Sequence, residues 1–549
     1  MPINDEEWAD LVAHEIPPND DAVIEKYLSS RAALIAEEKK HRSDHSFCQA
    51  LSPIAKRACD IIAKIAQQEK ALPDAASHHC DSLDGAKSFN ILRNLPKGAL
   101  LNAHLHSLID IPNLVNLVLS NEGVYISSPQ SLDPNLATSK VPIHLQFRNA
   151  PSPNGGNATS SIWASSYEPN TPTTLTEAVC SFPSSGEKEG GRAGFIEWLS
   201  DHLFQPPSLQ PSGGSDDRRD SAESPLSRLI YYEPIFRGIL QQIMTSLVEN
   251  NISWAEIRFT FPLGFHRNLS ETPETDYDLL FSIIHHELAK FRAALGPDQT
   301  FWGLRVIWST SPDSCASQRT LIENLDDCIA TKIAWPDLIA GYDAGPALSA
   351  SHLYAHILPS LFWLRKQSAL EDVQLPLLLT CPPAPNLGSS SSPLLFDCLL
   401  LGVRRISLSD ADEGFFGLLQ QHPRFLEGIR DKKILITSSS GSPALESLTA
   451  RGISCALSPE PRSGDLTRPY WDALRVAHGI DAAGLAALAE NSIRWSTFED
   501  KDSGQWTKEI REASVGGGIK AERLRRWAVE WERFSLGVVD EFGEEEEEG

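Results

Sequence analysis

Eight short apolar segments recur along the chain, each rich in β-branched, aromatic or leucine residues and each followed by a stretch of helical periodicity. The expected strands are 99–103, 254–261, 301–308, 338–342, 375–379, 404–408, 434–437 and 454–458. The intervening helices include 225–250, 276–295, 317–332 and 351–366. Eight strands, each followed by a helix, is the count of a (β/α)8 TIM-type barrel, so the predicted fold class is α/β. In such a barrel the chemistry lies at the C-terminal ends of the strands.

Helical periodicity also flanks the predicted barrel. Residues 22–71 have the pattern of two amphipathic helices that break near Pro53, with Asp20 or Asp21 as a cap. Residues 520–540 repeat this pattern near the C-terminus. An aromatic and apolar stripe runs along that last segment, formed by Leu524, Trp527, Trp531 and Phe534. We interpret the stripe as core packing.

The stretch from about 127 to 227 is rich in Gly, Pro and Ser. It predicts a long irregular insertion, interrupted by a short helix around 195–203. The expected organisation is therefore an N-terminal helical extension (1–94) and a barrel (95–510) that carries this insertion. A C-terminal helix (511–543) and an acidic tail (544–549) follow.

Composition narrows the classes of function. The net charge is −25, from 73 acidic and 48 basic residues, which disfavours electrostatic binding of nucleic acid. No apolar run is long enough to span a membrane, and the acidic start lacks the features of a secretory signal. The nine cysteines show no CxxC spacing and are typical of free thiols in a reducing compartment. We therefore expect a cytoplasmic protein without nucleic-acid or membrane partners.

Several motifs resemble one enzyme family. They are Leu95-Pro-Lys-Gly-Ala-Leu-Leu-Asn-Ala-His-Leu-His106, Ile339-Ala-Gly-Tyr-Asp343, Phe396–Ile406 and Leu488-Ala-Glu-Asn-Ser-Ile-Arg-Trp495. Together they resemble the adenosine deaminase family of the metal-dependent hydrolase superfamily, and within it the adenosine deaminase-related growth factor branch as found in fungi. The resemblance implies one zinc at the barrel mouth, held by three histidines and an aspartate. It also implies a zinc-activated water that converts adenosine to inosine and ammonia.

The family's site residues are largely replaced in this chain. The first strand should end in two metal histidines and a substrate aspartate, and it carries Asn102, His104 and His106. The glycine expected after the fourth strand is matched by Pro346. We therefore assign His106 and Pro346 to a vestigial substrate pocket.

The later strands diverge further. The fifth should end in His-Ala-Gly-Glu and has Thr380-Cys381-Pro382-Pro383, which removes a metal ligand and the proton donor. Leu408 stands in place of the sixth strand's histidine. After the eighth strand Glu460 matches the metal aspartate and Pro461 the catalytic one. The predicted metal residues are therefore only His104 and Glu460, both vestigial, and no catalytic residue is predicted.

Three functions remain open. The preferred hypothesis is a zinc-free pseudoenzyme that needs no cofactor and binds a purine nucleoside or a protein. The second is an active hydrolytic adenosine deaminase with zinc. The third is a rearranged metal site built from His104, His106, Cys381 or Glu460, because imidazole, thiolate and carboxylate groups are the usual zinc ligands.

Two further features concern partners and metals. In the growth-factor branch the N-terminal helices contribute to a dimer, and this chain has a similar segment with Ile24, Tyr27, Leu28, Leu34 and Ile35 at helical spacing. We expect either a homodimer, a heterodimer with an active relative, or helices that pack on their own barrel. His352 and His356 lie one helical turn apart, and we interpret them and the His285-His286 pair as surface residues.

Overall fold

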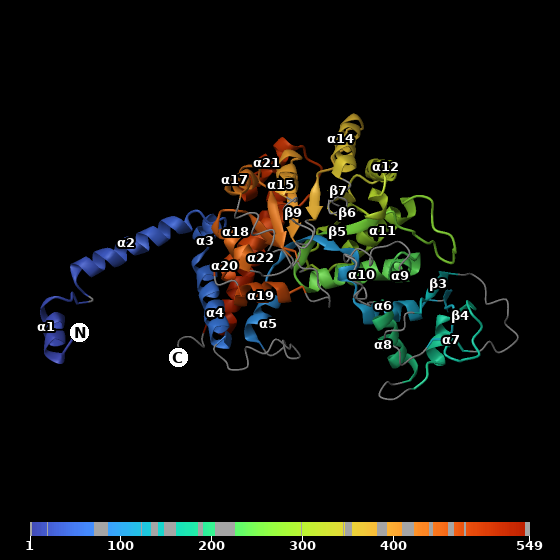
Figure 1. Ribbon diagram of the computed structural model, residues 1–549, viewed down its shortest axis with the longest axis horizontal. Coiled ribbons are helices and arrows are strands. Elements are labelled where there is room, and N and C mark those ends of the chain that lie inside the picture. Colours follow the sequence, from blue (N-terminus) through green and yellow to red (C-terminus); the bar gives the residue numbers. More distant parts are fainter. Residues whose placement is uncertain are drawn as a thin grey trace.

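Eight parallel strands form the centre of the computed structural model (Figure 1). They are β1 (Gly98–His104), β5 (Ile252–Phe261), β6 (Gly303–Thr310), β7 (Ile339–Asp343), β8 (Leu378–Thr380), β9 (Arg405–Leu408), β10 (Leu435–Ser438) and β11 (Cys455–Leu457). All eight strands expected from the sequence are confirmed. The structure describes residues 3–18, 20–70, 86–121, 123–132, 141–147, 161–184, 190–203, 225–297, 299–343, 345, 354–380, 392–408, 422–438, 443–458, 466–476 and 479–543.

The strands follow one another in space in the order in which they occur in the sequence. One sheet has the order β1-β5-β6-β7 and the other β11-β10-β9-β8, and a parallel bridge between Tyr342 and Leu377 joins them. Gly341 permits this junction, because a Cβ at its position would lie 2.5 Å from the carbonyl oxygen of Pro376. Side-chain contacts cross the interior from β1 to β10 and from β5 to β9. This is the predicted (β/α)8 order.

Helices separate the strands and cover them on the outside (Figure 1). They are α6 (Ile111–Leu119), α9 (Pro225–Ile230), α10 (Glu233–Glu249), α11 (Asp278–Ala294), α12 (Gln318–Ala334), α14 (Tyr354–Leu370), α15 (Ser392–Leu400), α17 (Pro423–Asp431), α18 (Pro443–Ala450), α19 (Arg468–Val476) and α20 (Ala482–Arg494). Their inward residues form one continuous apolar core with the strands. The burial of this core is the main term that stabilises the barrel.

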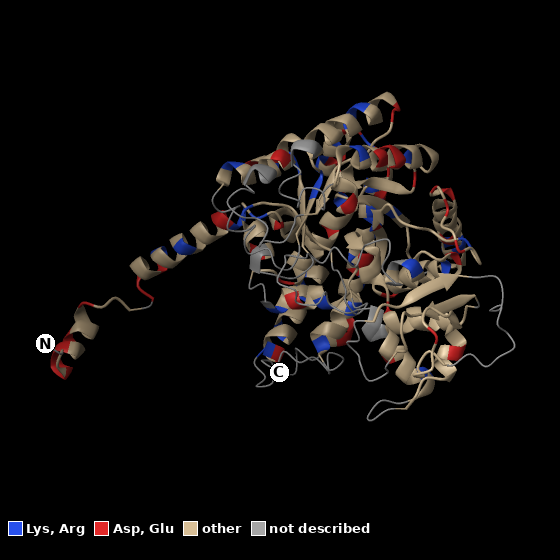
Figure 2. Cartoon of the chain, turned by 45° about the vertical axis from the view of Figure 1, so that its right-hand side comes forward, with Lys and Arg blue, Asp and Glu red and all other residues tan. Residues whose placement is uncertain are grey.

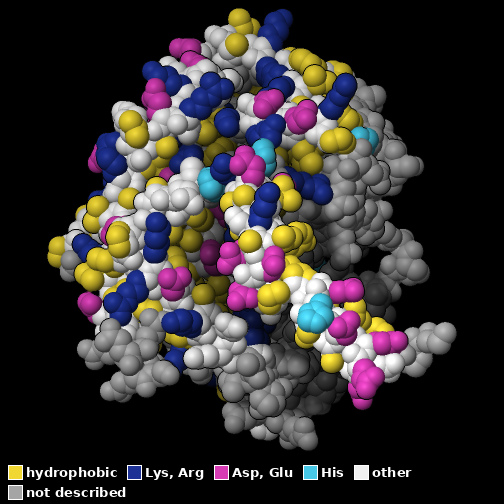
Figure 3. Space-filling view, turned by 90° about the vertical axis from the view of Figure 1, so that its left-hand side faces the viewer, with side chains coloured by type: hydrophobic (Ala, Val, Ile, Leu, Met, Phe, Trp, Pro, Cys, Tyr) yellow, Lys and Arg dark blue, Asp and Glu magenta, His cyan; other side chains and the backbone are white. Residues whose placement is uncertain are grey.

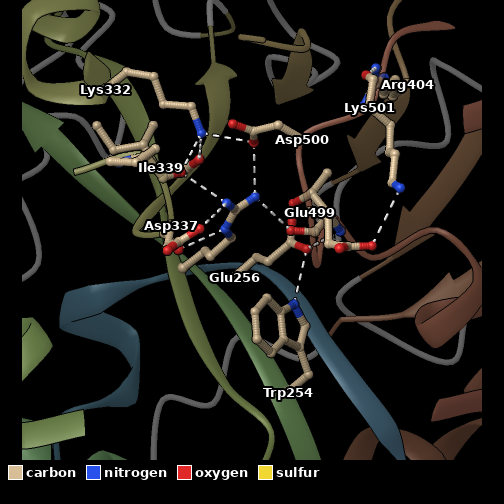
Figure 4. A network of polar contacts seen from close by, with 12 residues as sticks. Trp254, Glu256, Lys332, Asp337, Ile339, Arg404, Glu499, Asp500 and Lys501 are labelled. Atoms are coloured by element: carbon tan, nitrogen blue, oxygen red, sulfur yellow. Dashed lines mark hydrogen bonds and ion pairs between the residues drawn. The ribbon is translucent and has the colours of Figure 1, made fainter. Parts of the chain in front are cut away.

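The end of the barrel where the strands begin is closed by polar contacts around the segment after α20 (Figure 4). Trp254 Nε1 donates to Glu256 Oε1 at 3.1 Å, and Lys332 Nζ donates to Asp500 Oδ1 at 2.8 Å. Burial opposes ionisation of Glu256, but its ion pair with Arg405 outweighs this effect and lowers the pKa of Glu256. These buried charges are therefore paired with one another.

The C-terminal part packs against the helices near the N-terminus. α21 (Ser503–Glu512) leads into α22 (Gly518–Phe542), which lies along α4 (Pro53–Lys70) and α20. The stripe Leu524, Trp527, Trp531 and Phe534 is buried, so its interpretation as core packing is confirmed. α5 (Lys87–Arg93) completes this layer.

The first two helices do not share that packing. α1 (Asp5–His14) and α2 (Ala22–Lys39) have no buried residue and extend away from the body as an arm, whereas α3 (His45–Ala50) and α4 return to the barrel (Figures 1 and 2). The sequence predicts one helix from 22 to the break near Pro53, and the structure ends that helix at Lys39. The expected packing of apolar side chains on the body of the protein applies to α4, whose apolar face is buried, and to Phe47 of α3, whose ring lies beside Trp527.

The predicted insertion is not irregular throughout. β2 (Val124–Ser127), β3 (His144–Phe147) and β4 (Thr173–Thr174) form an antiparallel sheet in the order β3-β2-β4. α7 (Leu175–Cys180) and α8 (Gly191–Leu203) pack beside it, and α8 includes the short helix expected around 195–203. Strands this short give too few alternating positions to be recognised in sequence.

Candidate functional site at the barrel mouth

The described part of the barrel mouth contains Asn102, His104, His106, Thr380 and Leu408. Among the residues predicted for the site, Pro346 and Glu460 lie outside the described residues, as do Cys381, Pro382, Pro383 and Pro461. His352, which we interpret from the sequence as a surface residue, also lies outside them. The structure therefore informs the ends of the first, fourth, fifth and sixth strands.

The end of β1 is distorted at Asn102. Its φ is +72°, a left-handed conformation that asparagine tolerates better than most residues, and the register with β5 shifts at this point. Asn102 Nδ2 donates to Thr437 Oγ1 at 2.9 Å on β10. Its Oδ1 is buried and accepts no hydrogen bond from the residues described. The resemblance in sequence predicts a metal-binding imidazole at this position, where the chain has this amide oxygen.

A buried ion pair lies beside Asn102. Arg258 Nε on β5 is 2.9 Å from Asp343 Oδ2 at the end of β7, and both side chains are almost completely buried. Arg258 Nη1 also donates to the backbone oxygen of Asn102 at 3.2 Å. A permanently charged guanidinium therefore occupies the barrel interior next to Asn102.

The Asp343 carboxylate also accepts hydrogen bonds from Thr380 in β8 and from Gly345. The backbone N–H of Thr380 donates to Asp343 Oδ1 at 2.9 Å, and the Thr380 hydroxyl donates to Oδ2 at 2.7 Å. Gly345 N–H donates to Oδ1 at 2.9 Å. The sequence predicts the loss of a metal histidine at Thr380, and in the structure the Thr380 hydroxyl donates to a carboxylate of the protein itself.

His104 and His106 are brought together by the turn after β1. Their ring centroids are 5.3 Å apart, and both side chains are half-buried. This is the pair that a rearranged metal site requires. A catalytic zinc needs about three protein ligands, and among the described residues no three His, Cys, Asp or Glu side chains cluster in this way. The described donors thus fit a zinc ion poorly.

Sequence reasoning missed Arg258 and Asp343. A charged residue within an apolar strand is hard to orient from one sequence, since the side of the sheet depends on register. One signal was available, because Arg258 lies among the apolar residues Ile257 and Phe259 in a strand that should be buried on both faces. A charged side chain that is buried on such a strand needs a residue of opposite charge beside it. By contrast, His285 and His286 are exposed on α11, as predicted.

Comparison with known proteins identifies sequence relatives. Adenosine deaminase 2-A from Danio rerio is 22% identical over 476 residues, which cover 82% of this chain and 82% of the relative. Adenosine deaminase 2 from Homo sapiens is 21% identical over 332 residues, covering 57% of this chain and 58% of the relative. No family model matches the chain. The chain is therefore similar to proteins named adenosine deaminase 2, in one case over most of its length.

Comparison with solved structures gives matches at lower sequence identity. The crystal structure of an amidohydrolase from Burkhoderia ambifaria with bound Zn gives a TM-score of 0.45 at 12% identity, and the match covers 85% of this chain and 97% of that one. Separately, no helix in the described part of the chain is long and apolar enough to cross a membrane.

Proposed function

We propose that this chain is a degenerate, zinc-free member of the adenosine deaminase-related growth factor branch as found in fungi. It acts by binding a purine nucleoside or a protein in the cytoplasm and does not hydrolyse adenosine. The observation that carries this proposal is the Arg258 guanidinium beside Asn102.

The electrostatic argument concerns the charge of the site. Two unit charges about 4 Å apart repel by about 4 kcal/mol at an effective dielectric constant of 20, and a divalent ion doubles that figure. Arg258 forms an ion pair with Asp343, and this pair carries no net charge. Among the described residues, the pair therefore supplies no anionic surroundings that would offset the desolvation of a zinc ion near Asn102.

The chemical argument concerns the ligands and the acid. Asn102 and Thr380 offer neutral oxygens where the family has imidazoles, and the Thr380 hydroxyl already donates to Asp343. Pro383 stands where the ring-protonating glutamate is expected, and a proline carries no proton to donate. Water activation and ring protonation are both weakened.

The second candidate is zinc-dependent deamination of adenosine. It is favoured by the similarity to proteins named adenosine deaminase 2 over most of the chain. The proximity of His104 and His106 favours the related hypothesis of a rearranged metal site. Both hypotheses require a tightly held metal ion.

Metal content and activity distinguish these candidates. We expect far less than one zinc per chain by elemental analysis after purification in zinc-supplemented medium. We also expect no change in ultraviolet absorbance with adenosine or 2′-deoxyadenosine. One zinc per chain, together with turnover that is abolished both by a chelator and by His104→Ala, would refute the zinc-free proposal. His285→Ala is the matched control, since this histidine is exposed on α11.

We further propose that the chain forms a dimer through its N-terminal arm, either with a copy of itself or with an active relative. The arm, residues 3–40, exposes large apolar side chains: Ile3, Trp8, Val12, Ile16, Val23, Tyr27, Leu28, Leu34 and Ile35. Figure 3, in which the arm points toward the viewer, shows hydrophobic side chains between acidic ones along it. Such a surface is unfavourable in water and supports a partner that covers it.

A further inference from the structure

A cavity of about 460 Å³ lies beneath the barrel, at the end where the strands begin. It is formed by the connection between α11 and β6, which includes Phe301 and Trp302, and by the first turns of α22. Its volume is within the range of small-molecule sites. Since the barrel mouth lies at the opposite ends of the strands, this cavity is separate from the candidate site described above.

Three arginines line this cavity: Arg292 from the last turn of α11, and Arg523 and Arg526 from α22. Arg523 and Arg526 are three positions apart, so they lie on one face of the helix. Arg526 Nη2 donates to Thr300 Oγ1 at 3.0 Å, and its Nε lies 3.8 Å from Glu530. Arg526 is therefore the member of this set that is already held by the protein.

Arg523 is held by rings instead of by an acid. Its guanidinium carbon lies 4.0 Å from the ring centroid of Phe498, 4.9 Å from that of Trp254 and 5.3 Å from that of Trp302. Its Nη1 is buried and has no hydrogen-bond partner among the residues described. The pKa of Arg523 is lowered to about 10, mainly by burial and secondly by the positive charge of Arg292. The two guanidinium groups therefore repel each other.

Among the described residues, no carboxylate neutralises Arg292 or Arg523. Neither arginine forms an ion pair with an Asp or Glu side chain in that part of the chain. Glu522 lines the cavity and acts on Arg523 only at longer range, and Glu499 is engaged with Lys501 at 3.4 Å. In a chain with a net charge of −25, this is an unusual local excess of positive charge.

We propose that this cavity is a binding site for a small oxyanion of the phosphate or carboxylate class. The oxyanion accepts hydrogen bonds from the exposed guanidinium of Arg292 and from the part of the Arg523 guanidinium that lines the cavity, since arginines recognise such groups through planar donor pairs. Its charge offsets the repulsion between the two arginines. The competing explanation is structural, with Arg523 only closing the barrel by stacking on the three rings.

Calorimetric titration of the full chain with inorganic phosphate, and separately with acetate at matched ionic strength, tests the site. We expect saturable binding of one of the two, weakened at least tenfold by Arg292→Gln, because a hydrogen bond to a charged group contributes about 1.5–3 kcal/mol. Arg319→Gln is the control, since it removes the same charge from an exposed position on α12.

Arg292 is exposed, so its replacement should leave the fold intact, whereas Arg523 packs against three rings. Arg523→Lys therefore serves as a second variant. It retains the positive charge but loses the planar donors, and we expect it to weaken phosphate binding while the thermal midpoint changes little. Absence of binding at about 10 mM of either anion, or equal binding by the Arg292→Gln and Arg319→Gln proteins, would overturn the proposal. The outcome is independent of zinc content and of deaminase activity.

Discussion

Arg258 and Asp343 illustrate how single residues determine what the barrel interior can hold. Their side chains are buried to about the same degree, and Asp343 also accepts hydrogen bonds from Thr380 and Gly345. A buried charge is tolerated only when it is paired and hydrogen-bonded. The ion pair and these hydrogen bonds together allow both charges to stay buried at the C-terminal ends of the strands.

Replacement of Arg258 should be costly for this reason. We expect Arg258→Met to lower the free energy of unfolding by about 3–5 kcal/mol, because Asp343 would remain buried without its cation. The double variant Arg258→Met, Asp343→Asn should recover a large part of the loss, since no uncompensated charge is left. Urea unfolding of both variants measures the coupling. Additive losses would show that the ion pair does not act as a unit.

The residues of the site were partly predictable. The sequence identifies His104 and His106 at the end of the first strand, and the structure brings their rings together. It does not reveal that Arg258 contacts Asn102, because this contact joins positions 156 residues apart and depends on the register of β5 against β1. The part of the site that depends on Pro346 and Glu460 stays a prediction.

The elements differ in how well periodicity predicts them. The eight strands were recognised because short apolar runs in a parallel barrel are buried on both faces and need no alternation. α2 has apolar residues at helical spacing as well, yet its Leu34 is 71% exposed. Periodicity indicates that a helix has an apolar face but not what covers that face. For α4 the cover is the barrel, and for α2 the described chain provides none.

Removal of the N-terminal arm tests whether its exposed apolar side chains form a dimer interface. A chain that begins at His41 should stay folded with an unchanged thermal midpoint, since α1 and α2 bury no residue. We expect light scattering to show a dimer for the full chain at about 10 μM and a monomer for the shortened one. The deletion must stop before α4, whose Ile61 and Ile62 belong to the core.

Point variants make the same test without shortening the chain. Tyr27→Glu and Leu34→Glu on the arm should dissociate the dimer, because each places a charge in an apolar interface. Val529→Glu is the matched control, since Val529 is exposed on α22 in the body. A full-length chain that is already monomeric at this concentration, and that binds no active relative, would contradict the proposed dimer.

The whole molecule should unfold cooperatively without metal. At the described strand ends Asn102 and Thr380 are neutral, and the buried charges of Arg258 and Asp343 are paired with each other. A thermal midpoint that is unchanged by a chelator is therefore expected, and calorimetry measures it. A midpoint that falls when metal is removed would indicate a structural ion.

Buried lysines give the whole molecule a characteristic dependence on pH. Lys520 is 4% exposed, and its Nζ lies 3.7 Å from Glu509 and 3.7 Å from the ring centroid of Trp506. Burial lowers the pKa of Lys520 to about 7, against an ordinary value of 10.5, and Glu509 opposes part of this effect. The folded chain therefore loses this proton at a lower pH than the unfolded chain does.

The sign of the effect follows from proton counting. Below about pH 7 both states carry the proton, and the folded state bears the full desolvation penalty of the charged amine. As pH rises above 7, the folded state releases the proton while the unfolded state keeps it, so stability increases by at most ~1.4 kcal/mol per pH unit. The rise ends near pH 9, because burial raises the pKa of thiols such as Cys455 from 9.0 to about 12 and favours unfolding in more alkaline solution.

Urea unfolding at about pH 7 and about pH 8.5 should therefore show an increase of ~1–2 kcal/mol for the full chain. Lys520→Met keeps the apolar stem against Trp506 and removes the titrating amine, so it should abolish most of this increase. Lys508→Met is the matched control on α21, since that lysine is exposed and should leave the increase unchanged. The attraction between the Trp506 ring and the charged amine favours the protonated form and opposes part of this rise. The same increase in all three proteins would show that Lys520 stays protonated in the folded state, paired with Glu509, and that other groups set the dependence on pH.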